Sequence, residues 1–328
     1  MLKIVFMGTP DFAEKSLEKV FEAGYKREAV ITNPDKPKGR GMKLISSPVK
    51  QFAEAKGLNV LQPQKIKNNN EFIEEIKKIN PDVICVVAYG KILPKEILDI
   101  PKLGCINVHG SLLPKYRGAA PIQWAVLNGD KTTGITTMYM DVGMDTGDMI
   151  LKEETEIGED ETTGELWERL SNIGANLLVK TLELIEKGEA PREKQGENYS
   201  VAPMLEKEMA HISWQNQTAK QIKNLVRGLN PIMGAYSLEN DKKIKFWKVE
   251  AITNEDIINI FPEFKDYDYK LNAIEPGTIL FSNEKTGLYI KAKDGIIKVL
   301  EIQGENAKRM NISDFLRGNK LEVGTIFE

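Results

Sequence analysis

Three polar residues have the types and spacing to carry out acyl transfer: Asn107, His109 and Asp145. Asn107 and His109 lie two residues apart at the end of an apolar run that starts at Cys105, so in an extended strand both side chains point to one face. An amide can polarise a carbonyl group, and an imidazole can move a proton. Because open parallel sheets bind ligands beyond the carboxyl ends of their strands, the sequence predicts a site here.

Asp145 lies in the loop after the next strand, between Gly143 and Gly147, and these glycines are expected to take positive φ angles and let the backbone approach a ligand. If the two strands are adjacent and parallel, the Asp145 carboxylate reaches His109 and holds its imidazole. The three groups suit acyl transfer through an oxyanion without a covalent intermediate. Without such a partner, His109 would equally well be a structural histidine bonded to a loop carbonyl.

Several other kinds of site are not favoured. No serine elbow or activated cysteine lies nearby, which argues against a ping-pong hydrolase. The two cysteines, Cys85 and Cys105, lie in apolar runs and are expected to be inert core thiols. With only two histidines in the chain, His109 and a peripheral His211, we expect no metal site. Gly8 follows the first strand, but no Gly-x-Gly-x-x-Gly pattern continues it, so NAD binding is not indicated.

The segment 33–43 is rich in proline, glycine and cations and is expected to form an exposed loop. It contains four basic residues, with Lys50 just beyond: Lys36, Lys38, Arg40 and Lys43. These cations either form a solvated surface or an arm that binds the phosphates of a polyanion. Spacing alone leaves both interpretations open.

The elements that would position these groups alternate between strands and helices as far as residue 186, which predicts an α/β doubly wound, Rossmann-like domain over residues 1–187. Residues 188–207 are polar and are interpreted as a linker. From residue 208 to 328, several short strand-like runs with turns between them predict a small β-barrel of the oligonucleotide-binding (OB) type.

Bulk properties agree with two soluble domains, since 328 residues are too many for one ordinary core. The formal net charge of −3 gives no global signal for nucleic-acid binding, although local basic surfaces remain possible. No apolar run approaches the roughly 18 residues of a membrane span, and the first strand starts at once without a leader. We therefore expect a cytoplasmic protein, without membrane contact, and a monomer.

Longer motifs surround the three polar residues. They include Phe6-Met-Gly-Thr-Pro-Asp-Phe-Ala13, Pro34-Asp-Lys-Pro-Lys-Gly-Arg-Gly41, Tyr116-Arg-Gly-Ala-Ala-Pro-Ile-Gln-Trp124 and Gln303-Gly-Glu-Asn-Ala-Lys-Arg-Met310. With Asn107-x-His109, Ser111 to Pro114 and Asp145, the chain resembles the folate-dependent formyltransferase superfamily. The resemblance covers essentially the whole chain and is closest to the branch that acts on initiator methionyl-tRNA.

The resemblance implies an activity, two substrates and roles for named residues. The formyl group of 10-formyltetrahydrofolate, the co-substrate, would pass to the α-amino group of methionine on initiator methionyl-tRNA, supporting translation initiation. Asn107 would bind the formyl oxygen, His109 would stabilise the oxyanion, and Asp145 would orient His109 and help to remove the amine proton. The resemblance also implies two sets of binding residues: the folate site of Ser111, Leu112, Leu113, Pro114, Val87, Ala88, Tyr89 and Gly90, and the tRNA-binding loop of Lys36, Lys38, Arg40 and Lys43.

Two other functions remain as alternatives. One is formylation of a nucleotide-linked amino sugar, which would leave the loop at 33–43 idle. The other is a non-catalytic RNA-binding or one-carbon-sensing protein, which would gain nothing from the residues at positions 107, 109 and 145.

The resemblance also implies that the C-terminal barrel would follow the tRNA backbone, although the C-terminal part has no net charge and contains the acidic residues Glu263, Asp266 and Asp268.

Overall fold

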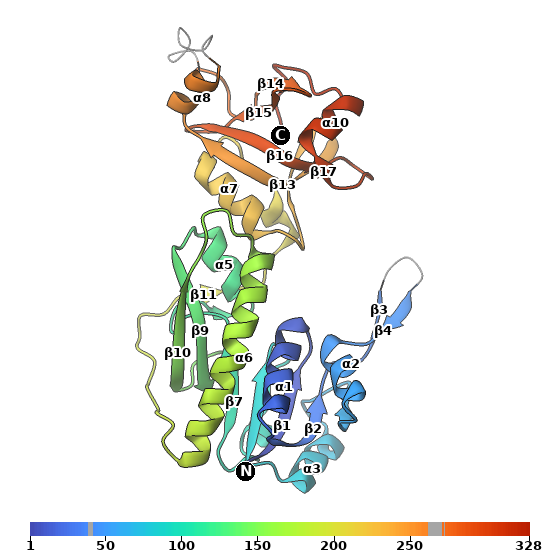
Figure 1. The fold of residues 1–328 in the computed structure, drawn as a ribbon, viewed down its shortest axis with the longest axis vertical. Coiled ribbons are helices and arrows are strands. Elements are labelled where there is room, and N and C mark those ends of the chain that lie inside the picture. Colours follow the sequence, from blue (N-terminus) through green and yellow to red (C-terminus); the bar gives the residue numbers. More distant parts are fainter. Residues whose placement is uncertain (39–41, 262–270, 272) are drawn as a thin grey trace. The chain divides into compact units, whose positions relative to one another are not determined.

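The computed structural model describes residues 1–38, 42–261, 271 and 273–328, and these form two compact units (Figure 1). Unit 1 comprises Met1–Ile122, Thr132–Glu156 and Glu165–Met204. Unit 2 comprises Gln123–Lys131, Ile157–Gly164 and Leu205–Glu328. The contiguous boundaries expected from the sequence stay a prediction; in the structure, unit 2 includes two short segments from the N-terminal part of the chain. Among the described residues, no helix is both long and apolar enough to cross a membrane.

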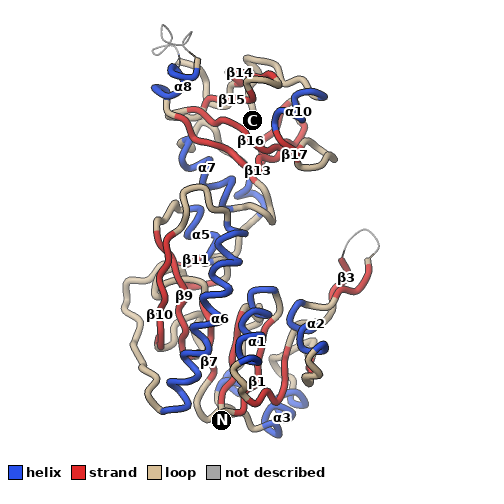
Figure 2. The backbone as a smooth tube through the Cα atoms, in the orientation of Figure 1, coloured by secondary structure: helices blue, strands red, loops and turns tan. Residues whose placement is uncertain are grey.

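Unit 1 is built on a seven-stranded sheet with the order β10-β9-β7-β6-β1-β2-β5 (Figure 2). The five strands from β7 to β5 are parallel, as the alternation of strands and helices predicts, whereas β9 is antiparallel to both β7 and β10. The strands are β1 (Lys3–Gly8), β2 (Lys26–Ile31), β5 (Val60–Leu61), β6 (Val83–Val87), β7 (Cys105–His109), β9 (Thr132–Tyr139) and β10 (Met149–Glu156).

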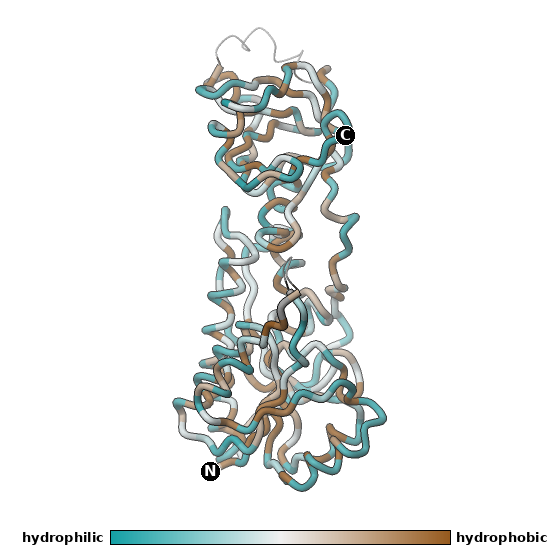
Figure 3. The backbone as a smooth tube through the Cα atoms, turned by 90° about the vertical axis from the view of Figure 1, so that its right-hand side faces the viewer, coloured by the Kyte–Doolittle hydropathy of each residue, from teal (hydrophilic) through white to brown (hydrophobic). Residues whose placement is uncertain are grey.

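Helices cover both faces of this sheet, so the doubly wound, Rossmann-like α/β class is confirmed. On one face, α1 (Asp11–Glu22) and α6 (Thr163–Lys187) meet through a T-shaped contact between Phe12 and Trp167. On the other, α3 (Asn70–Ile79) and α4 (Lys95–Leu98) share a core with alternate residues of β1, β2 and β6. Two further helices are α2 (Pro48–Ala55) and α5 (Pro121–Leu127). Figure 3 shows hydrophobic positions gathered in the middle of the unit that contains the N-terminus and hydrophilic positions toward its outside.

Side chains along β7 alternate between the two faces of the sheet, and this alternation decides which face carries Asn107 and His109. Cys105 belongs to the core beneath α3 and α4, whereas Val108 lies against Gly174 of α6, where an added Cβ would come within 3.0 Å of the valine side chain. Asn107 and His109 are in phase with Cys105, so both side chains point to the α3–α4 face at the carboxyl end of the strand.

Residues 193–202, which we call the strap, cross unit 1 without forming a helix. Glu193 and Met149 exchange two backbone hydrogen bonds of 2.8 and 2.9 Å. Further along, β11 (Val201–Ala202) pairs in parallel with β8 (Arg117–Gly118). A stretch whose polarity indicates a linker thus makes ordered contacts with two strands of unit 1, β10 and β8.

Unit 2 contains an antiparallel sheet of order β12-β13-β16-β15-β14, with β17 paired to β16. Leu238 of β12 exchanges two backbone hydrogen bonds with Glu328, and Ile279 of β14 donates to Thr325, so the C-terminal segment joins the two edge strands and closes the predicted barrel. The elements are β12 (Ala235–Glu239), β13 (Lys242–Ile252), β14 (Ile279–Asn283), β15 (Gly287–Lys291), β16 (Ile296–Gln303), β17 (Met310–Asn311), α7 (Ala219–Gly228), α8 (Asn254–Ile260), α10 (Ile312–Gly318) and a 3-10 turn, Lys207–Ala210.

Replacing Phe327 tests this closure, because its ring is fully buried against Trp214 and Phe246. We expect Phe327→Ala to lower the free energy of unfolding by about 3–5 kcal/mol, since truncation of a core aromatic leaves a cavity. Urea unfolding followed by tryptophan fluorescence would measure the loss. Val323→Ala, at a position 64% exposed, is the matched control, and equal effects of the two changes would contradict the role of the segment.

Candidate active site

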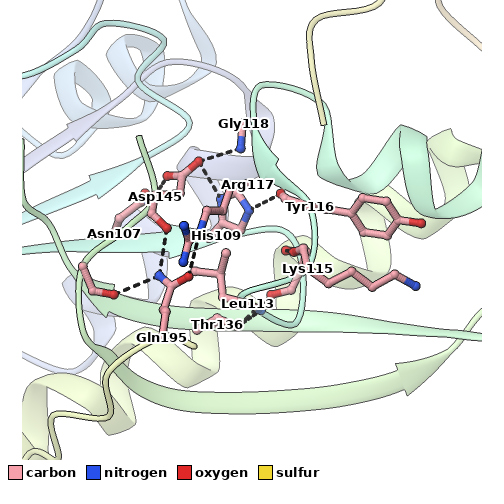
Figure 4. Close-up of polar contacts among 12 residues, drawn as sticks. Asn107, His109, Leu113, Lys115, Tyr116, Arg117, Gly118, Thr136, Asp145 and Gln195 are labelled. Atoms are coloured by element: carbon pink, nitrogen blue, oxygen red, sulfur yellow. Dashed lines mark hydrogen bonds and ion pairs between the residues drawn. The ribbon is translucent and has the colours of Figure 1, made fainter. Parts of the chain in front are cut away.

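His109 is buried at the end of β7, with 5% of its surface exposed. Its Nε2 lies 2.8 Å from the carbonyl oxygen of Tyr116 (Figure 4). A carbonyl oxygen can only accept a hydrogen bond, so Nε2 carries a proton. The other ring nitrogen, Nδ1, is not used by this bond and faces Asp145.

Asp145 lies opposite Nδ1 and joins the three residues. Its Oδ2 is 3.6 Å from His109 Nδ1, and its Oδ1 is 3.4 Å from the Asn107 amide nitrogen. The backbone N–H of Gly118 donates to Oδ2 at 2.8 Å. The structure therefore brings together an amide, an imidazole and a carboxylate, and it adds a backbone donor that the sequence did not reveal.

The route by which Asp145 reaches this place differs from the expected one. The expectation of adjacent parallel strands is wrong, because β9 runs antiparallel to β7 and pairs its end, Tyr139, with Ile106. The loop 140–148 must therefore turn back along β7 to bring the carboxylate over Asn107 and His109. This strand direction places the start of the loop at the opposite end of β7 from the site.

The glycines on either side of Asp145 also differ from expectation. Asp145 itself has a positive φ of 54°, whereas Gly143 and Gly147 are not among the residues with positive φ. Gly147 is needed for space, since a Cβ there would lie 1.8 Å from the carbonyl oxygen of Tyr139. At Gly143 an added Cβ would lie 2.1 Å from the Thr146 hydroxyl. Close packing, rather than conformational freedom, requires these two glycines.

The strap forms hydrogen bonds with the Asp145 loop and with the segment of Tyr116 and Arg117. The sequence interpretation missed these contacts. Gln195 donates two hydrogen bonds to backbone carbonyls of the Asp145 loop and accepts one from Arg117 Nε. Ser200 Oγ accepts from the N–H of Tyr116 at 2.9 Å, and the Ser200 carbonyl accepts from the N–H of Arg117 at 2.8 Å. No local signal distinguishes Gln195 or Ser200 within a stretch rich in polar residues.

Three non-glycine residues around the site have positive φ angles: Ala88 at 44°, Tyr116 at 63° and Asp145 at 54°. Each belongs to a different loop at the end of a strand of unit 1. Such backbone conformations persist where the surrounding structure holds them, and they are concentrated at functional sites. The clustering therefore points to this edge of the sheet as the working part of unit 1.

The residues expected to bind folate lie at the same edge. Ala88 and Gly90 are exposed at a sharp turn after β6, and Asn33 holds this turn by donating to the Tyr89 carbonyl at 2.8 Å. The Val87 and Tyr89 side chains are buried. In the next loop, the side chains of Ser111 and Leu113 are also buried, whereas Leu112 and Pro114 are partly exposed. Ligand contacts in these loops would thus come from backbone groups, Leu112 and Pro114.

The basic loop forms a hairpin of β3 (Lys36–Lys38) and β4 (Lys43–Ile45). Arg40, the expected tRNA contact, lies outside the described residues. At the base of the hairpin, Asp35 forms a 2.8 Å ion pair with Lys50, and this hydrogen bond lowers the pKa of the Asp35 carboxyl and raises that of Lys50. Lys50 is thus paired with Asp35 at the base of the hairpin, and its role as a phosphate-binding cation stays a prediction. Lys36 is exposed.

The remaining candidate residues are peripheral or inert. His211 Nε2 lies 3.0 Å from the Glu328 carbonyl oxygen in unit 2. Cys85 and Cys105 are buried free thiols, and burial raises the pKa of the Cys105 thiol to about 12. Within the described part of the chain, no cluster of three or more histidine, cysteine, aspartate or glutamate residues could hold a metal ion.

Comparison with known proteins assigns this fold and site to a class. Residues 2–182 match the model of the formyl transferase family, and residues 204–320 match that of the formyl transferase C-terminal domain. The chain belongs to the formyl transferase family. Its relatives include the methionyl-tRNA formyltransferase of Caldanaerobacter subterraneus subsp. tengcongensis, with 47% identity and 100% coverage of both chains, and that of Clostridioides difficile, with 48% identity and 99% coverage of both.

Solved structures with lower sequence identity share the fold. The N-formyltransferase of Helicobacter canadensis, in complex with folinic acid and dTDP-3-aminofucose, has a TM-score of 0.66 and 22% identity, covering 91% of this chain and 99% of that one. HypX of Aquifex aeolicus, in complex with tetrahydrofolic acid, has a TM-score of 0.63 and 15% identity, covering 99% of this chain and 50% of its own.

Gly147→Ala tests whether close packing of the Asp145 loop matters for activity. The added Cβ must push the loop away from Tyr139, and we expect kcat/KM for formyl transfer to fall about 100-fold, because displacements of about 1 Å have this effect on positioned groups. Gly196→Ala is the matched control, since an added Cβ there meets nothing within 4 Å. Wild-type kcat/KM in Gly147→Ala would show that the loop tolerates the shift.

Proposed function

We propose that this chain transfers the formyl group of 10-formyltetrahydrofolate to the α-amino group of methionine on initiator methionyl-tRNA, the reaction of a methionyl-tRNA formyltransferase, and so supports translation initiation. The observation that carries the proposal is the constellation of Asn107, His109 and Asp145 at one sheet edge, in a chain with full-length relatives of that name at 47–48% identity. The co-substrate supplies the activated formyl group.

The reaction makes three demands on the protein. The amine nitrogen attacks the formyl carbon, a new C–N bond forms, and the formyl oxygen gains negative charge. The bond to the folate nitrogen then breaks and the charge returns to the carbonyl. The amine loses one proton, the departing nitrogen gains one, and the overall reaction is balanced. The protein must therefore stabilise an oxyanion, accept a proton and keep both substrates aligned.

The three site residues match these demands. Asn107 offers an amide N–H to the formyl oxygen, because its present bond to Asp145 is long, at 3.4 Å, and easily exchanged. His109 keeps Nε2 on the Tyr116 carbonyl and presents Nδ1 to the reacting groups. Asp145 orients His109 and receives the amine proton, while the Gly118 N–H fixes one carboxylate oxygen.

The two loops at this edge fit a folate co-substrate. A pteridine presents alternating donors and acceptors at its rim, which the exposed backbone of the turn at Ala88 and Gly90 can satisfy. The partly exposed Leu112 and Pro114 provide apolar contacts on the neighbouring loop. These residues lie on loops that end β6 and β7, where ligands of doubly wound sheets bind.

Recognition of the tRNA is assigned to the basic hairpin and the C-terminal barrel. The segment 33–43 contains four cations within eight residues, Lys36, Lys38, Arg40 and Lys43, and such a cluster suits phosphate contacts. The barrel is neutral overall, but β13 carries four lysines at positions 242, 243, 245 and 248. We propose that the enzyme acts as a monomer in the cytoplasm, where translation starts.

Offering different acceptors tests the proposed function directly. Purified protein and 10-formyltetrahydrofolate are incubated with charged initiator methionyl-tRNA, with free methionine, or with a nucleotide-linked amino sugar. We expect formyl transfer to the charged tRNA alone. Transfer to the sugar alone would replace the proposal with the amino-sugar alternative, and no transfer to any acceptor would remove the proposal.

Substitutions at the constellation test the roles assigned to it. We expect Asp145→Asn and His109→Asn each to reduce kcat by a factor on the order of 10²–10⁴, because proton transfer and charge stabilisation are lost. Single-turnover formylation would measure the rate, and circular dichroism would check the fold. Asp99→Asn is the control, as its carboxylate pairs with Lys95 of helix α4 and both side chains are exposed. Near-wild-type rates in either site variant would contradict the mechanism.

The tRNA arm is tested by Arg40→Ala. Loss of one phosphate contact should raise KM for initiator methionyl-tRNA and leave KM for 10-formyltetrahydrofolate unchanged, with a salt dependence weaker than that of the wild type. The comparison variant is Lys102→Ala, which removes an exposed cation of unit 1 away from the hairpin. An unchanged tRNA KM for Arg40→Ala would remove the arm from the proposal.

A further inference from the structure

Gln195 stands out in the strap because its amide is half-buried, while its neighbours from 191 to 194 and from 196 to 199 are exposed. Its Nε2 donates to the carbonyl oxygens of Asp145, at 2.8 Å, and Gly147, at 2.9 Å, and its Oε1 accepts from Arg117 Nε at 2.8 Å (Figure 4). Carbonyl oxygens only accept and a guanidinium only donates, so the orientation of this amide is fixed by its partners.

The two bonds from Nε2 hold the backbone on which the Asp145 carboxylate depends. Asp145 has a left-handed backbone with φ of 54°, a conformation that is uncommon outside glycine and is held here by the surrounding structure. Gln195 fixes the carbonyl of that residue and the carbonyl two positions later. A shift of this short piece of backbone would move both carboxylate oxygens away from His109 and the Gly118 N–H.

We propose that Gln195 is a positioning residue for formyl transfer: its two amide hydrogens hold the Asp145 loop so that the carboxylate faces His109. The inference rests on the function proposed above and adds a residue outside the Asn107, His109 and Asp145 constellation. Gln195 acts through Asp145 and does not touch the reacting atoms.

A second possible route is through Arg117, whose guanidinium lies 4.5 Å from the centre of the Tyr199 ring and is bound by the same amide. Two substitutions separate the routes chemically. Gln195→Glu keeps an oxygen for Arg117 but replaces the donor nitrogen with a second, charged oxygen that repels the Asp145 and Gly147 carbonyls. Gln195→Met keeps the length of the side chain and removes all three bonds.

The test measures kcat and KM for both substrates in each variant. We expect both variants to lose about 100-fold in kcat, because a displaced carboxylate affects the reaction itself. KM for 10-formyltetrahydrofolate and for methionyl-tRNA should stay within about twofold, since loss confined to kcat marks an interaction made in the transition state. Thermal unfolding should not change. Gln217→Met is the matched control, because it removes a half-buried glutamine that accepts a hydrogen bond from the Ser213 N–H in unit 2.

Each other result overturns the inference. Wild-type kcat in Gln195→Glu with loss in Gln195→Met would assign the role to Arg117. Raised KM values together with a lower Tm would show a general structural role, and unchanged rates in both variants would show none. Failure of the proposed function is distinguishable, because the wild-type protein itself would then not formylate methionyl-tRNA.

Discussion

The arrangement of unit 1 depends on one carboxylate being held in place. Asp145 receives the Gly118 N–H at 2.8 Å and faces the Asn107 amide and His109 Nδ1 at 3.4 and 3.6 Å. Only 16% of its side chain is exposed, and a charge removed from water to this extent needs hydrogen-bond donors to offset the loss of hydration. The donors come from a strand and from the loop that follows it, so their positions require the sheet, the turn and the strap together.

The reversed direction of β9 explains much of the local backbone. With Tyr139 paired to Ile106, the loop 140–148 starts near the beginning of β7 and has to cover the strand before reaching its end. It achieves this with a left-handed residue at Asp145 and with Gly147 pressed against the Tyr139 carbonyl. Asp141 accepts hydrogen bonds from Gly143 and Thr146 within the loop, and bonds from the strap and from Gly118 add to these.

Features set by residues close together in the sequence could be predicted, whereas contacts between residues far apart in the sequence could not. The common face of Asn107 and His109 follows from two-residue alternation, and the parallel core follows from runs apolar on both faces. The direction of β9 relative to β7 has no such local signature, because the hydrophobic pattern of a strand is the same whether it pairs in parallel or antiparallel. The Gln195 contact joins residues 50 positions apart, and the Lys50–Asp35 pair was hidden because a sequence shows charges without their partners.

His109 shows how a structural and a catalytic interpretation can both hold. The alternative expectation was a histidine bonded to a loop carbonyl, and the bond from Nε2 to the Tyr116 carbonyl is of that kind. That bond fixes the ring orientation and the tautomer, and so leaves Nδ1 toward Asp145. The loop that provides the acceptor also provides the Gly118 donor to Asp145, and the strap holds both through Ser200 and β11. Fixing one nitrogen therefore makes the other available for chemistry, and the same loop sets the position of imidazole and carboxylate alike.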